Sequence, residues 1–205
     1  MNKESLKLFE KKKGIFLMFE QKTAIFLTIG LFLLIIIEKQ FEKDYHDLVT
    51  PFIVIWGFSC LALAISVTTR EQLVKGKFIG EIVFEKDKII LGETNYNLNE
   101  ISKISFEKSY DIKGIATNHM IDFAPKKSNG LDNVVKIFLS NGEKLEFNFL
   151  QTKNRRLKNY KDTLIDYYKL GLIEWLQLLN ILGINNYKKI QDFKKEIINY
   201  GQQSI

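Results

Sequence analysis

The chain has 205 residues, enough for one domain or for a smaller domain with an appendage, and 46% of them are hydrophobic. Its net charge of +6 comes almost wholly from lysine, which is a point charge without arginine's bidentate fork. This bias argues against base-specific nucleic-acid recognition and favours attraction to anionic membrane surfaces. The single cysteine, Cys60, excludes an intrachain disulfide.

Residues 1–22 form a basic amphipathic leader in which lysines alternate with apolar side chains. Such a composition is typical of a helix lying among lipid headgroups, and it is equally typical of a solvated basic arm. Both interpretations stay open at this point. In either case Lys11, Lys12 and Lys13 are candidates for contact with an anionic surface.

Residues 23–69 are expected to form a two-helix transmembrane hairpin. The segment Leu48–Thr69 holds about 22 uncharged residues and is long enough to cross a bilayer as a helix. Its neighbour Thr23–Ile37 covers only roughly 22 Å at about 1.5 Å per residue, but the short connection lets it return through the same bilayer. Glu38 and Lys39 follow it where a cleaved signal would have small residues, so we expect the segment to be retained.

The distribution of positive charge orients this hairpin. Lysine and arginine flank it on both sides, whereas the loop between the two segments carries only Lys39 and Lys43. Because cytoplasmic flanks are enriched in positive residues, both termini are expected in the cytoplasm. The predicted location is a bacterial inner membrane, with a multi-pass topology.

From Gly76 onward the hydrophobic period changes to two, which is typical of strands. In KLEFNFL the side chains of Leu145, Phe147 and Phe149 share one face, and Asn141-Gly142 just before it predicts a hairpin. Further runs of this kind are KFIGEIVFE, KIIL, NYNL, ISKISFEKS, VVKIFLS and a segment near HMIDFAP. About seven closely spaced strands predict a mainly-β antiparallel barrel or sandwich.

An amphipathic helix is expected after the last strand. Its apolar positions keep a spacing of three or four residues: Leu157, Tyr160, Leu164, Ile165 and Tyr168. About seven strands capped by a C-terminal helix are similar to the pleckstrin-homology (PH) fold, and DKIILGETNYNLNEISKISFEKS resembles the opening of bacterial PH-like domains. The resemblance covers residues 75–169 and implies a binding or scaffolding module, so the predicted class is α+β.

The resemblance does not extend to inositide recognition. Phosphoinositide-binding PH domains carry clustered lysine and arginine around the first hairpin, where this chain has Glu85, Lys86, Asp87 and Lys88.

Residues 170–205 are expected to form a C-terminal helical extension. Glu174, Gln177 and Asn180 make a narrow polar stripe on an otherwise apolar helix, which must bury most of its circumference. Three partners for this helix remain open: the barrel, the membrane interface and a second subunit. The candidate contact residues are Trp175, Leu176, Leu179 and Leu182.

No catalytic residue, cofactor or metal site is predicted. His46 and His119 would lie on opposite sides of the membrane, and the chain has no paired cysteines or His-x-Glu pattern. Asp111, Asp122 and Asp132 are interpreted as solvated turn residues. A second group of cations is expected to meet on one face of the domain and to contact anionic headgroups: Lys126, Lys127, Lys153, Arg155, Arg156 and Lys158.

Two functions follow from this layout. The first is a non-enzymatic, membrane-anchored PH-like module that recruits or regulates a protein partner, or associates with itself, at the cytoplasmic face. The second is a two-span effector of the kind found in antiphage defence, in which a small ligand such as a nucleotide binds the barrel and drives assembly of the hairpins. The second predicts a polar pocket inside the barrel, and the first predicts a filled core.

Overall fold

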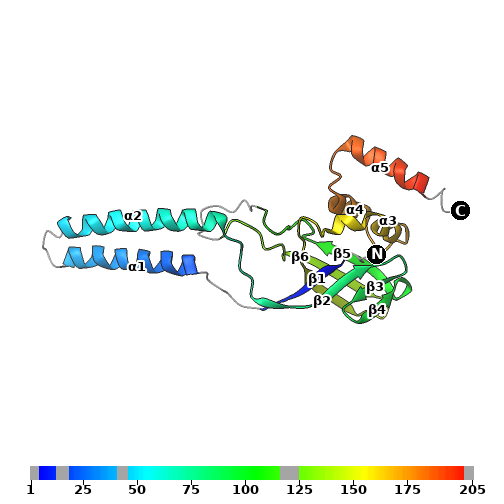
Figure 1. Ribbon diagram of the computed structural model, residues 1–205, viewed down its shortest axis with the longest axis horizontal. Helices are drawn as coiled ribbons and strands as arrows, with labels where there is room; N and C mark the ends of the chain where they lie inside the picture. The colour runs from blue at the N-terminus through cyan, green and yellow to red at the C-terminus, as the bar shows by residue number, and fades with distance from the viewer. Residues whose placement is uncertain (1–4, 13–18, 41–45, 116–124, 201–205) are drawn as a thin grey trace. The chain divides into compact units, whose positions relative to one another are not determined.

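A computed structural model of the protein describes residues 5–12, 19–40, 46–115 and 125–200 (Figure 1). The chain divides into two compact units. The first, called here the sheet unit, comprises Met1–Lys12, Val74–Lys113 and Asn129–Ile205. The second, the helical unit, comprises Lys13–Leu73 and Gly114–Ser128. The chain therefore passes between the units four times.

The sheet unit contains one seven-stranded sheet in which all neighbouring strands are antiparallel, with the order β4-β3-β2-β1-β7-β6-β5. The strands are β1 (Leu6–Lys11), β2 (Gly76–Phe84), β3 (Lys88–Leu91), β4 (Thr94–Asn97), β5 (Ile101–Glu107), β6 (Asn133–Leu139) and β7 (Lys144–Phe149). The predicted α+β class with about seven antiparallel strands is confirmed. Six of the predicted runs form strands, and the expected strand near HMIDFAP falls on residues 119–125, of which only Pro125 is described.

The seventh strand is β1, which lies within the predicted basic leader of residues 1–22. Leu6–Lys11 is neither an interfacial helix nor a solvated arm, because it pairs with β2 on one side and with β7 on the other. Leu6 and Leu8 are buried while Lys7 between them is exposed. A bulge between Leu8 and Phe9 shifts the register, and Phe9 is buried as well. This strand joins the β2-β3-β4 meander to the β5-β6-β7 meander.

Residue spacing accounts for the second meander. β6 alternates strictly between buried and partly exposed residues, as expected for a strand with one face on the core. The predicted turn at Asn141-Gly142 is confirmed: Gly142 has φ of 89°, and its N–H donates to Leu139 O at 3.0 Å. Only a residue that tolerates positive φ fits this turn.

Helices close the core of the sheet unit. They are the 3₁₀ helices η1 (Leu98–Glu100) and η2 (Leu157–Tyr160) and the α-helices α3 (Lys161–Lys169), α4 (Trp175–Leu182) and α5 (Tyr187–Tyr200). The predicted amphipathic helix is split between η2 and α3, and four of its five apolar positions are buried. Tyr167 is buried too, and its hydroxyl donates to Glu85 O at 2.6 Å. Burial raises the pKa of Tyr167, so the hydroxyl stays a donor at neutral pH.

The helical unit contains two long helices, α1 (Phe19–Gln40) and α2 (His46–Thr69), which run antiparallel side by side (Figure 1). The end of α2 is joined to the connection between β5 and β6: Lys126 N–H donates to Val67 O at 2.9 Å, and Gln72 N–H donates to Lys127 O at 2.8 Å. Part of that long connection therefore belongs to the helical unit and not to the sheet.

Candidate functional site

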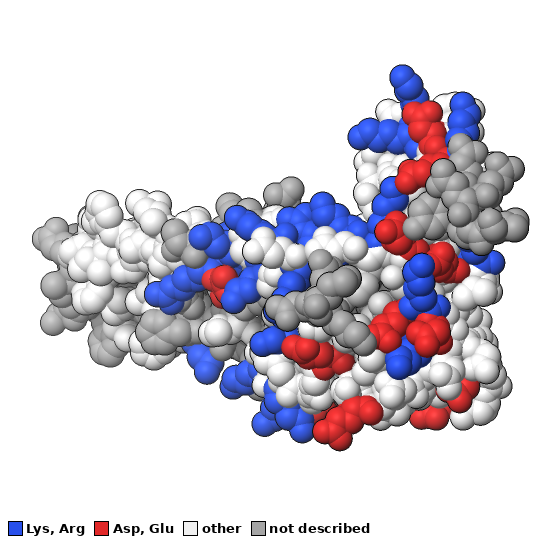
Figure 2. Space-filling view, turned by 45° about the vertical axis from the view of Figure 1, so that its right-hand side comes forward, with Lys and Arg blue, Asp and Glu red and all other residues white. Residues whose placement is uncertain are grey.

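The helix pair α1–α2 exposes large apolar side chains along its length. The exposed fractions are 77% for Phe26, 69% for Phe58 and 65% for Phe32. In Figure 2 the described surface of this pair is white over most of its length, without charged side chains. Contiguous apolar surface of this extent is rare on soluble monomers and marks contact with a membrane or a partner.

Among the described residues, one helix is long and apolar enough to cross a membrane. It covers Thr50–Thr68 within α2, has a mean hydropathy of 2.0 and is only 6% buried. The apolar part of α1, Gln21–Ile37, is shorter. An open gap of about 320 Å³ lies between the two helices, beside Gly30 and Trp56. The buried Trp56 Nε1 has no hydrogen-bond partner among the described residues.

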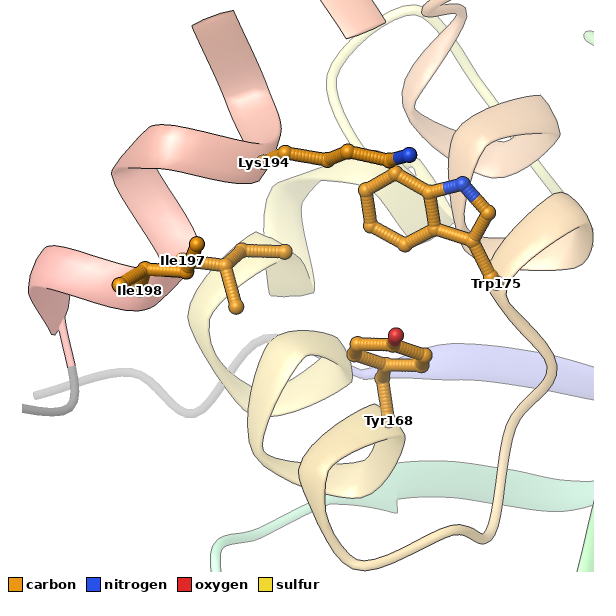
Figure 3. A pocket seen from close by; sticks show the side chains of 5 residues that line it. All are labelled: Tyr168, Trp175, Lys194, Ile197 and Ile198. Atoms are coloured by element: carbon orange, nitrogen blue, oxygen red, sulfur yellow. The ribbon is translucent and has the colours of Figure 1, made fainter. Parts of the chain in front are cut away.

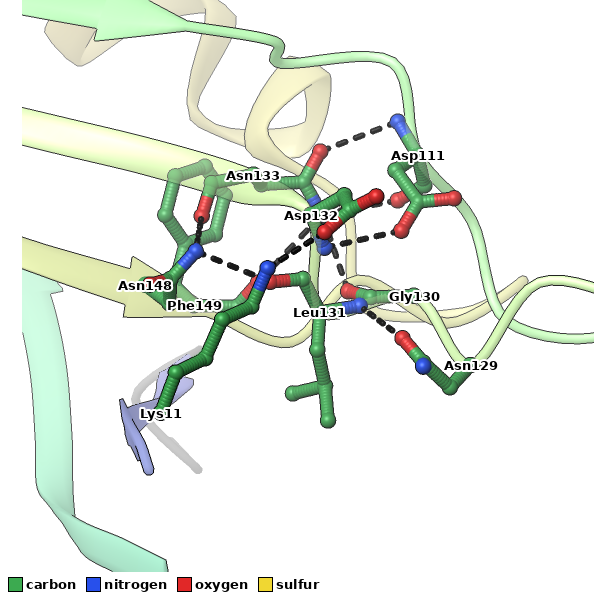
Figure 4. A network of polar contacts seen from close by, with 9 residues as sticks. All are labelled: Lys11, Asp111, Asn129, Gly130, Leu131, Asp132, Asn133, Asn148 and Phe149. Carbon is green, nitrogen blue, oxygen red and sulfur yellow. Dashed lines mark hydrogen bonds and ion pairs between the residues drawn. The ribbon is translucent and has the colours of Figure 1, made fainter. Parts of the chain in front are cut away.

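A polar network lies where β6 begins and β7 ends (Figure 4). The Asn133 side chain, which is fully buried, donates to Asp111 O at 2.8 Å and to Gly130 O at 2.9 Å. Its Oδ1 accepts from Asp111 N at 2.9 Å and from Gln151 Nε2 at 2.9 Å. A buried amide satisfied on both sides holds these backbone segments in one arrangement.

The same network reaches β1 and the segment after β7. Asp132 pairs with Lys11 through its carboxylate and donates its N–H to Asp111 Oδ2 at 2.9 Å. Buried Gln151 accepts from Leu157 N at 2.8 Å and so fixes the start of η2. The sequence predicts Asp111 and Asp132 as solvated turn residues and marks neither Asn133 nor Gln151. No pattern marks an isolated polar residue as buried, so this network was missed.

The predicted basic residues are divided between the two units. Lys126 and Lys127 belong to the helical unit, whereas Lys11, Lys12, Lys153, Arg155, Arg156 and Lys158 belong to the sheet unit. The expectation that Lys126 and Lys127 share one face of the β domain with the others is therefore not met within that unit. Lys153, Arg155 and Lys158 are exposed and Arg156 is half-buried. Lys13 lies outside the described residues.

Within the sheet unit, the segment Lys153–Lys158 gathers four cations with no acidic residue among them. Many other lysines there pair with carboxylates, as Lys103 does with Glu174 at 2.6 Å and Lys161 with Glu196 at 2.6 Å. Within the described chain, Lys153, Arg155 and Lys158 have no ion pair, and no Asp or Glu occurs between Leu150 and Lys158. This segment is called the basic loop below. Its chemistry suits an external anion.

The four candidate residues on α4 differ in environment. Leu179 is 4% exposed and belongs to the core of the sheet unit, so it is not available to a partner. Trp175 and Leu182 pack against that core, and only Leu176 is well exposed, at 70%. Helix α4 therefore packs most of its apolar surface on the β domain, which is the first of the three partners considered for it.

Trp175 forms one wall of a groove of about 390 Å³ between α3 and α5 (Figure 3). Its ring stacks on Phe193 with centroids 5.7 Å apart and lies 5.4 Å from the ring of Tyr168. Lys194 Nζ lies 5.9 Å from the Trp175 ring, a cation–π arrangement. Ile197 and Ile198 complete the lining, so α5 is held to the unit by aromatic contacts beside an open apolar groove.

Helix α4 and the segment before it cover the outer edge of β5. Ile104 N–H donates to Leu172 O at 2.7 Å, and Gln177 Nε2 donates to Phe106 O at 3.3 Å. The Lys103 ammonium holds the pKa of Glu174 below its ordinary value through a hydrogen bond at the same edge. Because these groups occupy the edge, β5 is a poor template for an added strand. The edge strand β4 at the other end of the sheet is short.

In the part of the chain that the structure describes, no group of three or more His, Cys, Asp or Glu side chains could hold a metal ion. No family model, no curated protein and no solved structure matches this chain.

Proposed function

We propose that this chain is a non-enzymatic, membrane-anchored binding module with a PH-like sheet unit at the cytoplasmic face of a bacterial inner membrane. The observation that carries the proposal is the exposed apolar surface of α1 and α2, where Phe26 and Phe58 are 77% and 69% exposed. In water such a surface would cost about 25 cal/mol per Å², and in a bilayer it is solvated by acyl chains.

Both helices cross the membrane in this proposal. The apolar part of α1 covers about 25 Å at about 1.5 Å per residue, against a hydrocarbon core of about 30 Å. Lys22 and Lys39 lie near its two ends, where long side chains can extend to the headgroups while the bilayer thins locally. The two termini then face the cytoplasm, as the positive flanks favour.

The sheet unit is better suited to binding at its surface than inside. Its core is filled by apolar side chains that include Ile82, Ile104, Ile137 and Leu164, all at 0% exposure. A filled core supports a module that contacts lipid or protein, and the PH-like domain is proposed on the seven strands and the helix η2–α3 that packs on them.

The topology is tested with single cysteines in a Cys60→Ser background. We expect a cysteine at Tyr45 to react with an impermeant maleimide added to right-side-out spheroplasts, and one at Ser204 to react only after lysis. The protein should also resist extraction by alkaline carbonate. Protection at Tyr45 together with reaction at Ser204 in intact spheroplasts would overturn the proposed topology.

A second candidate, the two-span effector, is favoured by one observation. The short α1 and the open gap beside Gly30 and Trp56 leave apolar surface for a second copy of the hairpin. This candidate predicts depolarisation and growth arrest when the chain is overexpressed with its ligand, whereas the binding module predicts an unchanged membrane potential. Following a potential-sensitive dye after induction separates the two.

A further inference from the structure

The basic loop is a fixed structure. Thr152 N–H donates to Arg155 O at 3.0 Å, and Arg155 N–H donates to Thr152 Oγ1 at 3.2 Å, which closes a tight turn. Arg156 Nε donates to Lys153 O at 3.1 Å, so this guanidinium fastens the turn from within. The exposed charges of Lys153, Arg155 and Lys158 are therefore presented together, with little backbone entropy left to lose on binding.

The loop lies at the end of the sheet unit from which the chain departs for the helical unit. Lys113 N–H donates to Gln151 O at 3.0 Å, and Gln151 N–H donates to Gly130 O at 3.0 Å. Lys113 is the last residue of the sheet unit before one passage, and Asn129 beside Gly130 is the first residue after the return. Gln151 thus places the start of the basic loop directly beside two of the four passages.

The other two connections to the helical unit, after Lys12 and before Val74, leave the sheet unit at the same end. Lys12 N–H donates to Lys75 O at 2.8 Å, which holds the exit of β1 beside the entry of β2. Lys11 just before that exit pairs with Asp132, a member of the Asn133 network. Val74 follows the end of α2 at Thr69 by five residues, and five extended residues cover at most about 18 Å. If α2 lies in a bilayer, this short linker keeps that end of the sheet unit close to the membrane surface.

We infer that the basic loop binds the anionic surface of the bilayer that holds the hairpin and thereby fixes the orientation of the sheet unit on the membrane. The inference rests on the proposed function, because it requires α2 to be in a bilayer. Three exposed cations, which form no ion pair with the described residues, complement a leaflet of negative surface potential. Because the three charges are exposed on the surface of one turn, recognition is expected to depend on lipid charge and not on one headgroup.

The test uses the full chain reconstituted in vesicles, with Cys60→Ser and Asn154→Cys carrying a bimane fluorophore. Asn154 lies inside the loop, and its side chain is exposed. Lipids with nitroxide on the headgroup report proximity by quenching, whichever way the protein is inserted. We expect quenching to rise about threefold when about 30% phosphatidylglycerol is added to phosphatidylcholine, and to fall back in about 1 M salt, where the Debye length is about 3 Å.

Matched variants distinguish an effect of the basic loop from an effect of the protein's overall positive charge. Lys153→Gln, Arg155→Gln and Lys158→Gln together remove three exposed charges, and the rise in quenching should disappear. Lys188→Gln, Lys189→Gln and Lys195→Gln remove three exposed charges from α5, and the rise should persist. Phosphatidylserine at equal charge should act as phosphatidylglycerol does.

Two results would overturn the inference. One is equal quenching in neutral and anionic vesicles. It would mean that the loop does not bind anionic lipid and that its cations serve a protein partner. The other is a rise that survives the triple substitution in the loop. Carbonate extraction of each sample keeps these results distinct from failure of the proposed function: protein that resists carbonate is integrated, whatever the loop does.

Discussion

At the scale of single residues, Asn133 is the most consequential polar side chain of the sheet unit. It is fully buried, and its side-chain amide forms hydrogen bonds with the β5–β6 connection (Figure 4). It also accepts a hydrogen bond from Gln151. Replacing it by alanine leaves two donors, on Asp111 and Gln151, and three backbone carbonyls without this partner in a low-dielectric interior. Asn133→Ala is expected to lower the free energy of unfolding by about 2–4 kcal/mol.

The measurement is urea unfolding in detergent, followed by Trp175 fluorescence in a Trp56→Phe background. Asn95→Ala on the edge strand β4 is the matched control, because Asn95 is exposed; its expected change is within about 0.5 kcal/mol. Equal effects of the two substitutions would show that the Asn133 network contributes nothing specific to folding.

A second residue-scale prediction concerns pH. The pKa of Glu174 is lowered in the folded state by Lys103, so the pair stabilises the protein above the ordinary carboxyl value of 4.5. That contribution is lost as pH falls from 4.5 through the lowered pKa. Lys103→Gln should therefore lower the urea midpoint at pH 7 and lower it less at pH 3. A deficit that is the same at both pH values would contradict the ion-pair explanation, and Lys189→Gln, at an exposed site on α5, serves as the control.

At the scale of elements, β1 is the strand that unites the two meanders. Leu8 is 3% exposed and pairs with Gly80 of β2 and with Phe149 of β7. Leu8→Asp places an unpaired carboxylate in the core, so we expect the sheet unit to lose cooperative unfolding and protease resistance. Lys7→Gln on the exposed face of the same strand should change neither. Had these residues been a lipid-bound leader, both variants would leave the sheet intact.

The elements also show where sequence reasoning succeeds. The runs in β2 to β7 and the Asn141-Gly142 turn were predicted, because alternation over several residues and a turn that needs positive φ are local properties. β1 was missed although LKLFEK alternates in its first residues, because its partners lie about 70 and 140 residues further along the chain. Strand pairing over such a separation produces no pattern in the residues next to the strand. The same reason hides the Asn133 network, whose members come from three separate segments.

At the scale of the whole molecule, the helical unit is inserted into two loops of the sheet unit, and this predicts that the two are separable. All members of the apolar core cluster lie in the sheet unit. At the first insertion, Lys12 N–H donates a hydrogen bond to Lys75 O. At the second, Gly114 N–H donates to Ser128 O, over a distance of 2.8 Å. Each insertion thus begins and ends at neighbouring positions, as a tight turn does.

Replacing residues 13–74 and 115–127 each by Asn-Gly should therefore yield a sheet unit that is soluble without detergent, since the exposed apolar helices are gone and the core is intact. Trp175, then the only tryptophan, should report a single cooperative urea transition. Adding Leu8→Asp to this shortened chain should abolish the transition. Aggregation of the shortened chain would mean that the helical unit contributes to the core, because the strands alone would then fail to bury their apolar faces.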